Sequence, residues 1–294
     1  GAGLDRGIYT DATGGLTINL AAGTVTGAGV GTDTLQSIEN IRGGNFADVY
    51  NANGFSGSST NAGSNGTLNS FEGMGGNDTI IGNGSTIALY QNASAGVTVD
   101  LLAGTAQGTD ANDLARIGTD TLSGVVSVAG SAFDDTLQGS NLTTTIESFI
   151  GNGGNDLIDG RGGLDRANYA TILDDNVTGG ISIDMASGFV TGDASVGTDT
   201  LRSIELVRGS QFADVYVATG FSNVSANAGS NGTFNEFEGM GGNDTITGNG
   251  NTRIAFYNAT GGVTVDLAAG TATGDASVGS DTITGGVNSI AGSQ

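Results

Sequence analysis

The sequence predicts an all-β fold, in which short parallel strands and glycine-rich turns coil into a β-solenoid, or β-roll, with loops inserted. Three observations favour it: abundant glycine without proline, blocks that recur at long fixed spacings, and short stretches that alternate apolar and polar residues. Of the 294 residues, 55 are Gly and none is Pro. Clusters of Gly disfavour long helices and permit tight corners, so short strands between sharp turns are expected.

The chain repeats itself on two levels. "FEGMGGNDTI" at residues 71–80 returns at 237–246, and "FADVY" at 46–50 returns at 212–216. A shorter block, "GVTVDLLAGTAQG" and its variants, begins at Gly15, Gly96, Gly180 and Gly262. We therefore expect one continuous array of repeat units covering residues 1–82, 83–159, 160–248 and 249–294, the last of them truncated. A large β-protein with internal duplication is the alternative, but a solenoid is favoured because neighbouring copies can bury each other's faces.

Alternation within the short block predicts half-buried strands. In "VTVDL" we expect Val97, Val99 and Leu101 to point inward, and the copies at 181–185 and 263–267 to follow the same pattern. "DTLQSIENI" at 33–41 predicts two short strands with a bend between them. The Ser-, Asn- and Gly-rich stretches at 52–66 and 218–232 predict inserted loops.

Composition excludes several classes of function. The formal net charge is −22, and neither Cys nor His occurs. Disulfides, thiolate metal sites and histidine-based triads are therefore excluded. Strong negative charge argues against nucleic acid as a partner, and no apolar run is long enough for membrane insertion. The adjacent acids at 134–135 and 174–175 lack any pocket signature, so we expect no enzyme. A chain this acidic must offset its charge before it packs, and a cation is the simplest means.

One nonapeptide combines glycine with aspartate in a way that suits calcium. The stretches that begin at 73, 151, 160 and 239 fit G-G-x-G-x-D-x-U-x, with Met74 replacing a glycine in the first. Calcium takes about six to eight oxygens in loose geometry, mixing carboxylates with backbone carbonyls. A glycine corner can turn several carbonyls toward one point, the aspartate adds charge, and the apolar residue two places later points into the coil.

The predicted calcium ligands follow from this motif. The principal candidates are the motif aspartates and their framing glycines: Asp78, Asp156, Asp165, Asp244, Asp5, Gly73, Gly75, Gly151, Gly153, Gly160, Gly162, Gly239 and Gly241. Weaker candidates are Asp33, Asp48, Asp120, Asp135, Asp199, Asp214 and Asp281. At Asp48 and Asp135 a phenylalanine stands where the motif's last glycine belongs, so these side chains could instead bond their own turns.

These residues resemble the RTX (repeats-in-toxin) family of calcium-binding β-roll proteins, whose signature is this nonapeptide. The resemblance implies a right-handed parallel β-roll that binds several calcium ions and folds upon binding them. It also implies bacterial secretion, usually by a type I system, and a location outside the cell or on its surface. The short blocks resemble spacers of very large secreted or surface-anchored members. The chain departs from the family in its short nonapeptide runs, and the corners at Gly82 and Gly248 lack the aspartate.

Two functions remain open. The first is a calcium-stabilised structural segment of a large extracellular protein, such as a stalk, surface layer, sheath or filament, with neighbouring repeats or copies of itself as partners. The alternative is an adhesin module that binds carbohydrate, a surface or ice. Aligned threonine rows or an exposed aromatic patch would favour the alternative.

Overall fold

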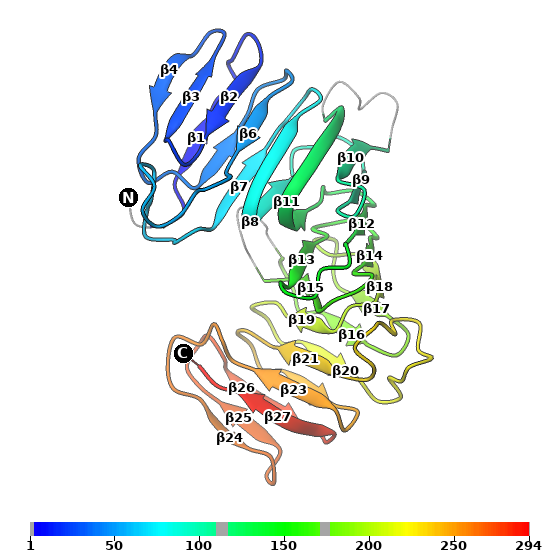
Figure 1. The fold of residues 1–294 in the computed structure, drawn as a ribbon. Coiled ribbons are helices and arrows are strands. Elements are labelled where there is room, and N and C mark those ends of the chain that lie inside the picture. Colours follow the sequence, from blue (N-terminus) through cyan, green and yellow to red (C-terminus); the bar gives the residue numbers. More distant parts are fainter. Residues whose placement is uncertain (1–2, 110–116, 171–176, 294) are drawn as a thin grey trace. The chain divides into compact units, whose positions relative to one another are not determined.

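The computed structural model describes residues 3–109, 117–170 and 177–293. Within these ranges the chain forms 27 strands and no helix, and most pairings between strands are parallel (Figure 1). No helix in the described part is therefore long and apolar enough to cross a membrane. This arrangement confirms the all-β prediction and is consistent with a β-solenoid. The chain divides into two compact units, residues 1–138 and 139–294. The division falls inside the predicted repeat unit 83–159.

The first unit contains two rows of strands. Parallel pairing orders the first row as β1 (Arg6–Ile8), β5 (Asn40–Arg42), β7 (Asn69–Glu72), the second half of β8 (Thr79–Leu89) and the second half of β11 (Thr119–Ala129). The second row runs β4 (Gly31–Thr34), β3 (Thr24–Gly27), β2 (Leu16–Asn19), β6 (Val49–Asn51), the first halves of β8 and β11, β10 (Thr105–Gly108), β9 (Val97–Asp100) and β12 (Thr136–Gln138).

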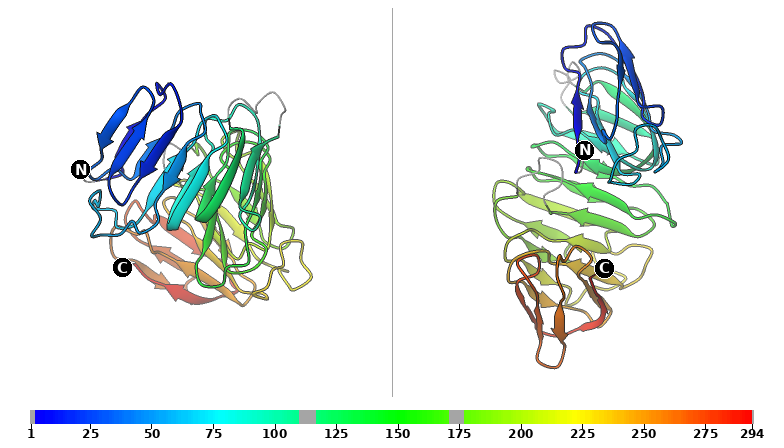
Figure 2. Two further views of the ribbon diagram at one scale, coloured as in Figure 1. Left: turned by 45° about the horizontal axis from the view of Figure 1, so that its top comes forward. Right: turned by 90° about the vertical axis from the view of Figure 1, so that its left-hand side faces the viewer.

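The second unit repeats this plan, with its strands stacked as successive arrows in Figure 2. Its first row is β13 (Glu147–Ile150), β15 (Asp165–Asn168), β19 (Leu206–Arg208), β21 (Asn235–Glu238), β23 (Thr252–Ala255) and β27 (Val287–Ala291). Its second row is β14 (Leu157–Asp159), β18 (Thr198–Arg202), β17 (Phe189–Thr191), β16 (Ser182–Asp184), β20 (Val215–Val217), β22 (Thr245–Thr247), β26 (Ser280–Ile283), β25 (Thr271–Thr273) and β24 (Thr264–Asp266).

The repeated short block departs from a purely parallel coil. Each copy forms an antiparallel meander of three strands, such as β2–β3–β4 and β16–β17–β18. The reason is the length of the connections, because a few residues suffice for a hairpin whereas a parallel return needs a long crossover. Positive φ angles of 66° at Gly23 and 85° at Gly29 permit the two tight turns of the first meander.

Local predictions within the coil are largely confirmed. Val97, Val99 and Ile183 are fully buried, as the alternation required. Leu101 is only half-buried, and the copy at 263–267 departs furthest from the prediction. Val263 and Val265 are half-buried and Leu267 is 42% exposed, because β24 is an edge strand that pairs only with β25 among the described strands. "DTLQSIENI" does form two strands, since β4 ends at Thr34 and β5 begins after a bend. Residues 52–66 form a loop, as do residues 218–232 apart from one isolated bridge.

Candidate cation sites

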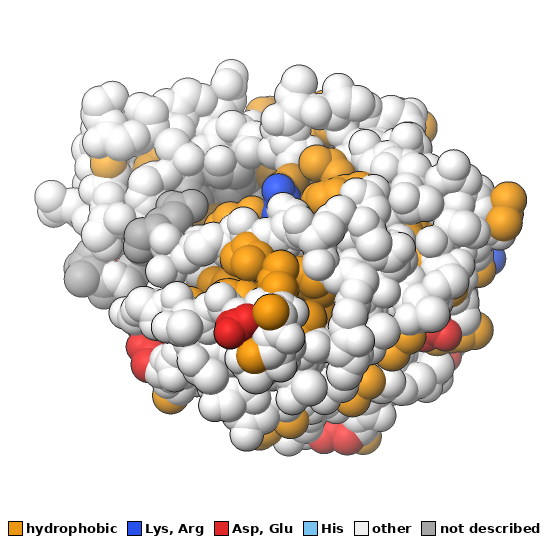
Figure 3. All heavy atoms as spheres, turned by 90° about the horizontal axis from the view of Figure 1, so that it is seen from below, with side chains coloured by type: hydrophobic (Ala, Val, Ile, Leu, Met, Phe, Trp, Pro, Cys, Tyr) orange, Lys and Arg blue, Asp and Glu red, His pale blue; other side chains and the backbone are white. Residues whose placement is uncertain are grey.

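Burial of acidic side chains is the unusual feature of this chain. Few acidic side chains are visible on the face drawn in Figure 3. Among the described residues, sixteen acids are buried: Glu39, Asp48, Glu72, Asp78, Asp120, Asp135, Glu147, Asp156, Asp165, Asp199, Glu205, Asp214, Glu236, Glu238, Asp244 and Asp281. Glu72, Glu238 and Glu236 form ion pairs with Arg42, Arg208 and Arg253. A buried carboxylate is costly unless hydrogen bonds or an opposite charge compensate it, so each remaining acid requires an explanation.

Parallel register stacks the aspartates of the second row in the first unit. The backbone N–H of Leu16 donates to Asp48 Oδ1 at 2.8 Å, that of Asp48 to Asp78 Oδ1 at 2.8 Å, and that of Asp78 to Asp120 Oδ1 at 2.9 Å. Each aspartate therefore binds the strand before it with one oxygen. Asp135 holds β9 in the same way, by accepting from the Val97 N–H at 2.7 Å.

The second unit contains the equivalent ladder. Asp214 Oδ1 accepts from the Ile181 N–H at 2.8 Å, Asp244 Oδ1 from Asp214 at 2.9 Å, and Asp281 Oδ1 from Asp244 at 3.1 Å. Asp199 Oδ1 accepts from Asp156 at 3.0 Å. The structure thus brings most of the predicted aspartates together in rows. In these rows one carboxylate oxygen accepts a hydrogen bond from the backbone of the neighbouring coil.

The second carboxylate oxygen, Oδ2, distinguishes two kinds of aspartate in these rows. In the first kind the protein satisfies it: Asp48 Oδ2 accepts from the Gly44 N–H at 2.9 Å, Asp214 Oδ2 from Ser210 at 2.7 Å, and Asp120 Oδ2 from the Tyr90 hydroxyl at 3.2 Å. In the second kind the oxygen is buried without a hydrogen-bond partner, as at Oδ2 of Asp78 and Asp244. Both of these aspartates, Asp78 and Asp244, belong to the nonapeptide.

The geometry of the nonapeptide corner explains why the first residue of the motif is glycine. A Cβ on Gly73 would lie 1.8 Å from Asp78 Oδ2, and one on Gly239 would lie 1.9 Å from Asp244 Oδ2. The carboxylate therefore folds back over the first glycine of its own motif. Gly151 and Asp156 form the same arrangement, with 2.1 Å between the added Cβ and Asp156 Oδ2.

The second motif position adopts a left-handed backbone whichever residue occupies it. Its φ is 66° at Met74, 66° at Asn152, 63° at Arg161 and 67° at Met240. A residue with a side chain pays roughly 1–2 kcal/mol for this conformation. The corner thus retains the glycine geometry of the motif even where the glycine has been replaced.

Desolvation and like charge raise the pKa of the unsatisfied carboxyls furthest. Burial, with Asp120 nearby, raises the pKa of Asp78 to about 8. Burial, opposed by the Asp214 N–H and reinforced by the Asp214 and Asp281 charges, raises the pKa of Asp244 to about 9. The pKa of Asp214 rises only to about 6, because backbone and serine donors oppose its burial. The nonapeptide carboxyls therefore need either a proton or a cation.

The residues present fit a calcium ion. A hard anionic oxygen without a partner, at a corner that any Cβ would fill, is suited to a cation that prefers oxygen. No group of three or more His, Cys, Asp or Glu side chains suited to a metal occurs among the described residues. Backbone carbonyls would therefore have to supply most of the ligands, as a glycine corner permits. The Gly73 carbonyl, for example, lies 3.1 Å from where a Cβ on Gly43 would stand in the adjacent coil.

The remaining predicted ligands have varied surroundings. Asp33 is exposed on edge strand β4, unlike its repeat equivalents Asp120, Asp199 and Asp281. Asp5 is partly buried on the opposite row, and its N–H donates to Glu39 Oε2 at 3.2 Å. The glycines at the third motif position lie against neighbouring corners. The N–H of Gly75 donates to the Gly44 carbonyl, and the N–H of Gly162 donates to the Ser140 carbonyl, both at 3.3 Å. Gly153 and Gly241 face the carbonyls of Ala194 and Ala276.

Sequence reasoning overlooked the acids of the first row. Glu39 and Glu205 are buried opposite Asp5 and Asp165, at the starts of neighbouring parallel strands. The available signal was the repeated "SIE" at residues 37–39 and 203–205, which carries a glutamate at the same repeat position.

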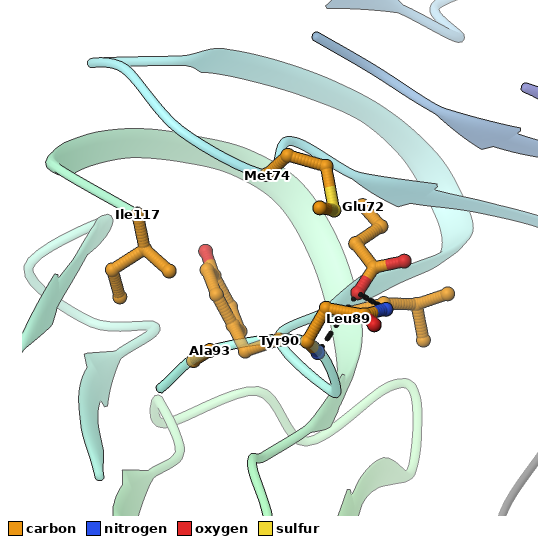
Figure 4. Close-up of a pocket in the computed structure, with 7 residues that line it drawn as sticks. Glu72, Met74, Leu89, Tyr90, Ala93 and Ile117 are labelled. Carbon is orange, nitrogen blue, oxygen red and sulfur yellow. Dashed lines mark hydrogen bonds between the residues drawn. The ribbon is translucent and has the colours of Figure 1, made fainter. Parts of the chain in front are cut away.

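A small pocket lies beside the first nonapeptide corner (Figure 4). Its lining is Glu72, Met74, Leu89, Tyr90, Asn92, Ala93 and Ile117. The Glu72 carboxylate is already engaged, since Oε1 accepts from the backbone and side chain of Asn92 at 3.0 and 2.6 Å and Oε2 accepts from Arg42 at 2.6 Å. The one carboxylate in the pocket therefore holds the strand ends together.

No protein-family model matches the chain, and a search of curated proteins found no match.

Proposed function

We propose that this chain is a calcium-stabilised structural repeat segment of a large extracellular bacterial protein. In this proposal it folds as a right-handed parallel β-roll of the RTX kind when calcium binds. The observation that carries the proposal is the pair of buried, unpartnered oxygens at Asp78 and Asp244, which recur at the same position of the same motif.

Charge supports a need for cations. The formal net charge is −22 with only eight basic residues, while sixteen described acids are buried. Ions at the corners would neutralise part of this charge and tie adjacent coils together. Ion binding would then contribute folding free energy directly. Calcium-poor surroundings would leave the chain self-repelling and expanded, so the proposal fits a protein that folds outside the cell, where modules with millimolar affinity are common.

The structural role rests on repetition. The same ladder, corners and loops occur in both units, and neighbouring repeats of a solenoid bury each other's faces. Edge strands such as β4 and β24 present unpaired backbone groups on one side within the described residues, which favours neighbouring repeats or copies of this chain as partners.

An adhesin module is the second candidate, and two observations favour it. Exposed threonines align across strands, as in the row Thr17, Thr26 and Thr32. Three phenylalanines at one repeat position are also exposed: Phe46, Phe133 and Phe212, at 42%, 46% and 42%. Such rows could contact carbohydrate, a solid surface or ice.

A calcium titration of EDTA-treated protein tests the proposal. We expect far-UV circular dichroism to show a cooperative gain of β-structure, with a parallel decrease in hydrodynamic radius. Subsequent growth into fibres or sheets would favour the structural role, whereas a monodisperse product that binds a glycan array or ice would favour the adhesin. A chain that is fully folded in EDTA, and whose stability calcium leaves unchanged, would refute the calcium-dependent roll.

A further inference from the structure

The two inserted loops lie beside a second set of buried acids, on the row opposite the aspartate ladder. In the second unit Asp165 is completely buried, and neither carboxylate oxygen has a hydrogen-bond partner. Its N–H donates to Glu205 Oε2 at 3.2 Å from the neighbouring strand. In the first unit Asp5 makes the same contact with Glu39, whose Oε1 is buried without a partner. Each unit thus contains one acidic pair where two adjacent parallel strands begin.

Each loop is attached to both strands of its acidic pair. Asn227, which is fully buried, exchanges two hydrogen bonds with the backbone of Ile204, at 2.9 and 2.7 Å, directly before Glu205. Asn231 donates to the carbonyl of Gly163, two residues before Asp165. The loop therefore spans the gap between the two acids.

The loop of the first unit repeats these contacts. Asn61 exchanges hydrogen bonds of 3.0 and 2.6 Å with the backbone of Ile38, directly before Glu39, and Asn65 donates to the Gly3 carbonyl. The loop backbone also lies against the glutamates. A Cβ on Gly63 would lie 2.1 Å from Glu39 Oε1, and one on Gly229 would lie 2.5 Å from Glu205 Oε1. Both loops therefore leave no room for a side chain over the carboxylate.

We propose that each loop closes a second kind of calcium site, in which Asp165 and Glu205, or Asp5 and Glu39, hold the ion between adjacent strands. Two carboxylates match the charge of a divalent cation, and carboxylate oxygens are ligands that calcium prefers. The proposal explains why a polar loop recurs in register, because the loop shields the ion from water and fixes both strands. It deepens the proposed function by assigning Glu39, Glu205 and the loops to calcium.

The alternative is a proton shared by the two carboxyls. Burial and the charges of Glu147, Glu205 and Asp159 raise the pKa of Asp165 to about 8, and burial, opposed by the Asp165 N–H, raises that of Glu205 to about 6. Glu147 faces Asp165 from the other side, on β13, with both of its oxygens accepting from Ser140. A protonated pair would bind no ion, so Glu205→Gln would leave the calcium count unchanged.

Hydrogen exchange of the full chain, followed by mass spectrometry, tests the inference. We expect calcium to slow exchange in residues 52–66 and 218–232. Glu205→Gln should abolish this protection in 218–232 alone and lower the calcium count in equilibrium dialysis by one, while loop 52–66 serves as the internal control. Glu39→Gln should have the converse effect. Asp184→Asn, which removes an exposed charge, should change neither loop.

Three results would overturn the inference: loop exchange that is indifferent to calcium, a calcium count unchanged by Glu205→Gln, or protection lost equally from both loops by Asp184→Asn. If Glu205→Gln unfolds the whole chain, Asn231→Ala provides the second variant. It keeps both acids but removes the hydrogen bonds from Asn231 to the Gly163 carbonyl and to the Glu205 carboxylate, so calcium protection should weaken in loop 218–232 only. Equal protection with and without Asn231 would again overturn the inference. If the wild-type chain folds with calcium while these variants behave as wild type, the inference fails and the proposed function stands. If no calcium binds at all, the proposed function fails.

Discussion

Two corners of adjacent coils in the first unit end in the same aspartate row but treat its carboxylate differently. At residues 43–48 the Gly44 N–H satisfies Asp48 Oδ2, and Gly44 has no left-handed backbone. At residues 73–78 Met74 is left-handed, and Asp78 Oδ2 has no partner. The side chain is the same in both, so the conformation of the backbone around it decides whether the protein or another group must satisfy the carboxylate.

The second unit repeats this comparison at residues 209–214 and 239–244. Ser210 supplies both its N–H and its hydroxyl to Asp214, at 2.7 Å each, whereas Asp244 Oδ2 is again without a partner. In one kind of corner the protein's own donors satisfy both carboxylate oxygens, whereas in the other kind one oxygen is suited to a cation. The difference can be tested by pH and by substitution.

The largest expected effect is the pH dependence of the calcium-free chain. The pKa of Asp78 and Asp244 in the folded state, about 8 and about 9, lies above the unfolded value of about 3.9. Between these values the folded chain binds more protons than the unfolded chain, so stability falls as pH rises. We therefore expect the fraction of folded chain in EDTA, measured by far-UV circular dichroism, to decrease from pH 5 to pH 9.

Calcium provides the control for the pH series. A bound ion keeps these two carboxylates ionised, so the folded fraction should decrease less over the same pH range in excess calcium. A flat series in EDTA would show that the unsatisfied carboxyls are not coupled to folding.

The next prediction compares one aspartate from each kind of corner. Asp244→Asn keeps the amide oxygen for the Asp214 N–H but removes the charge, so the calcium midpoint of folding should rise at least about tenfold, or about 1.4 kcal/mol. Asp214→Asn weakens charge-assisted bonds from Ser210 and Ile181, so stability should fall by about 2–4 kcal/mol. That loss should be measurable by urea unfolding in saturating calcium, and the number of bound calcium ions should equal that of the wild-type chain, whereas Asp244→Asn should lower it. An equal loss of bound calcium in both variants would mean that the acids act only through net charge.

A smaller effect is expected from filling the nonapeptide corner. In Gly239→Ala the new Cβ would lie 1.9 Å from Asp244 Oδ2, so the carboxylate must move, at a cost of about 1–3 kcal/mol in calcium. Gly262→Ala is the matched control, because a Cβ there meets nothing within 4 Å. Thermal unfolding in saturating calcium measures both, and indistinguishable variants would contradict the close approach.

The smallest predicted effect concerns the left-handed residue. Met240→Gly removes the strain of a side chain at φ 67°, and the gain of about 1–2 kcal/mol is reduced by the greater entropy of an unfolded glycine. We expect a net change between zero and about 1 kcal/mol of stabilisation, measured by urea unfolding in calcium. A clear loss of stability would show that the Met240 side chain packs more tightly than its half-exposed position indicates.

The sequence alone determined the period, the strand pattern and the acids of the nonapeptide, because these depend on local chemistry. Glycine clusters disfavour helices, and the alternation of apolar and polar residues predicts which valines are buried. The repeated "GMGGND" identifies Asp78 and Asp244 as the acids of the motif. The loops at 52–66 and 218–232 were equally apparent, since Ser, Asn and Gly without alternation cannot form a strand that buries one face.

Only the tertiary structure decided which strands are antiparallel, which carboxylate oxygens are satisfied, and that Glu39 and Glu205 lie opposite Asp5 and Asp165. The physical reason is that each depends on partners some 30 to 40 residues away, such as the Asp48 N–H that binds Asp78 and the Asp165 N–H that binds Glu205. Parallel register converts a period in the sequence into a stack in space, and the register is set by how successive coils pack together.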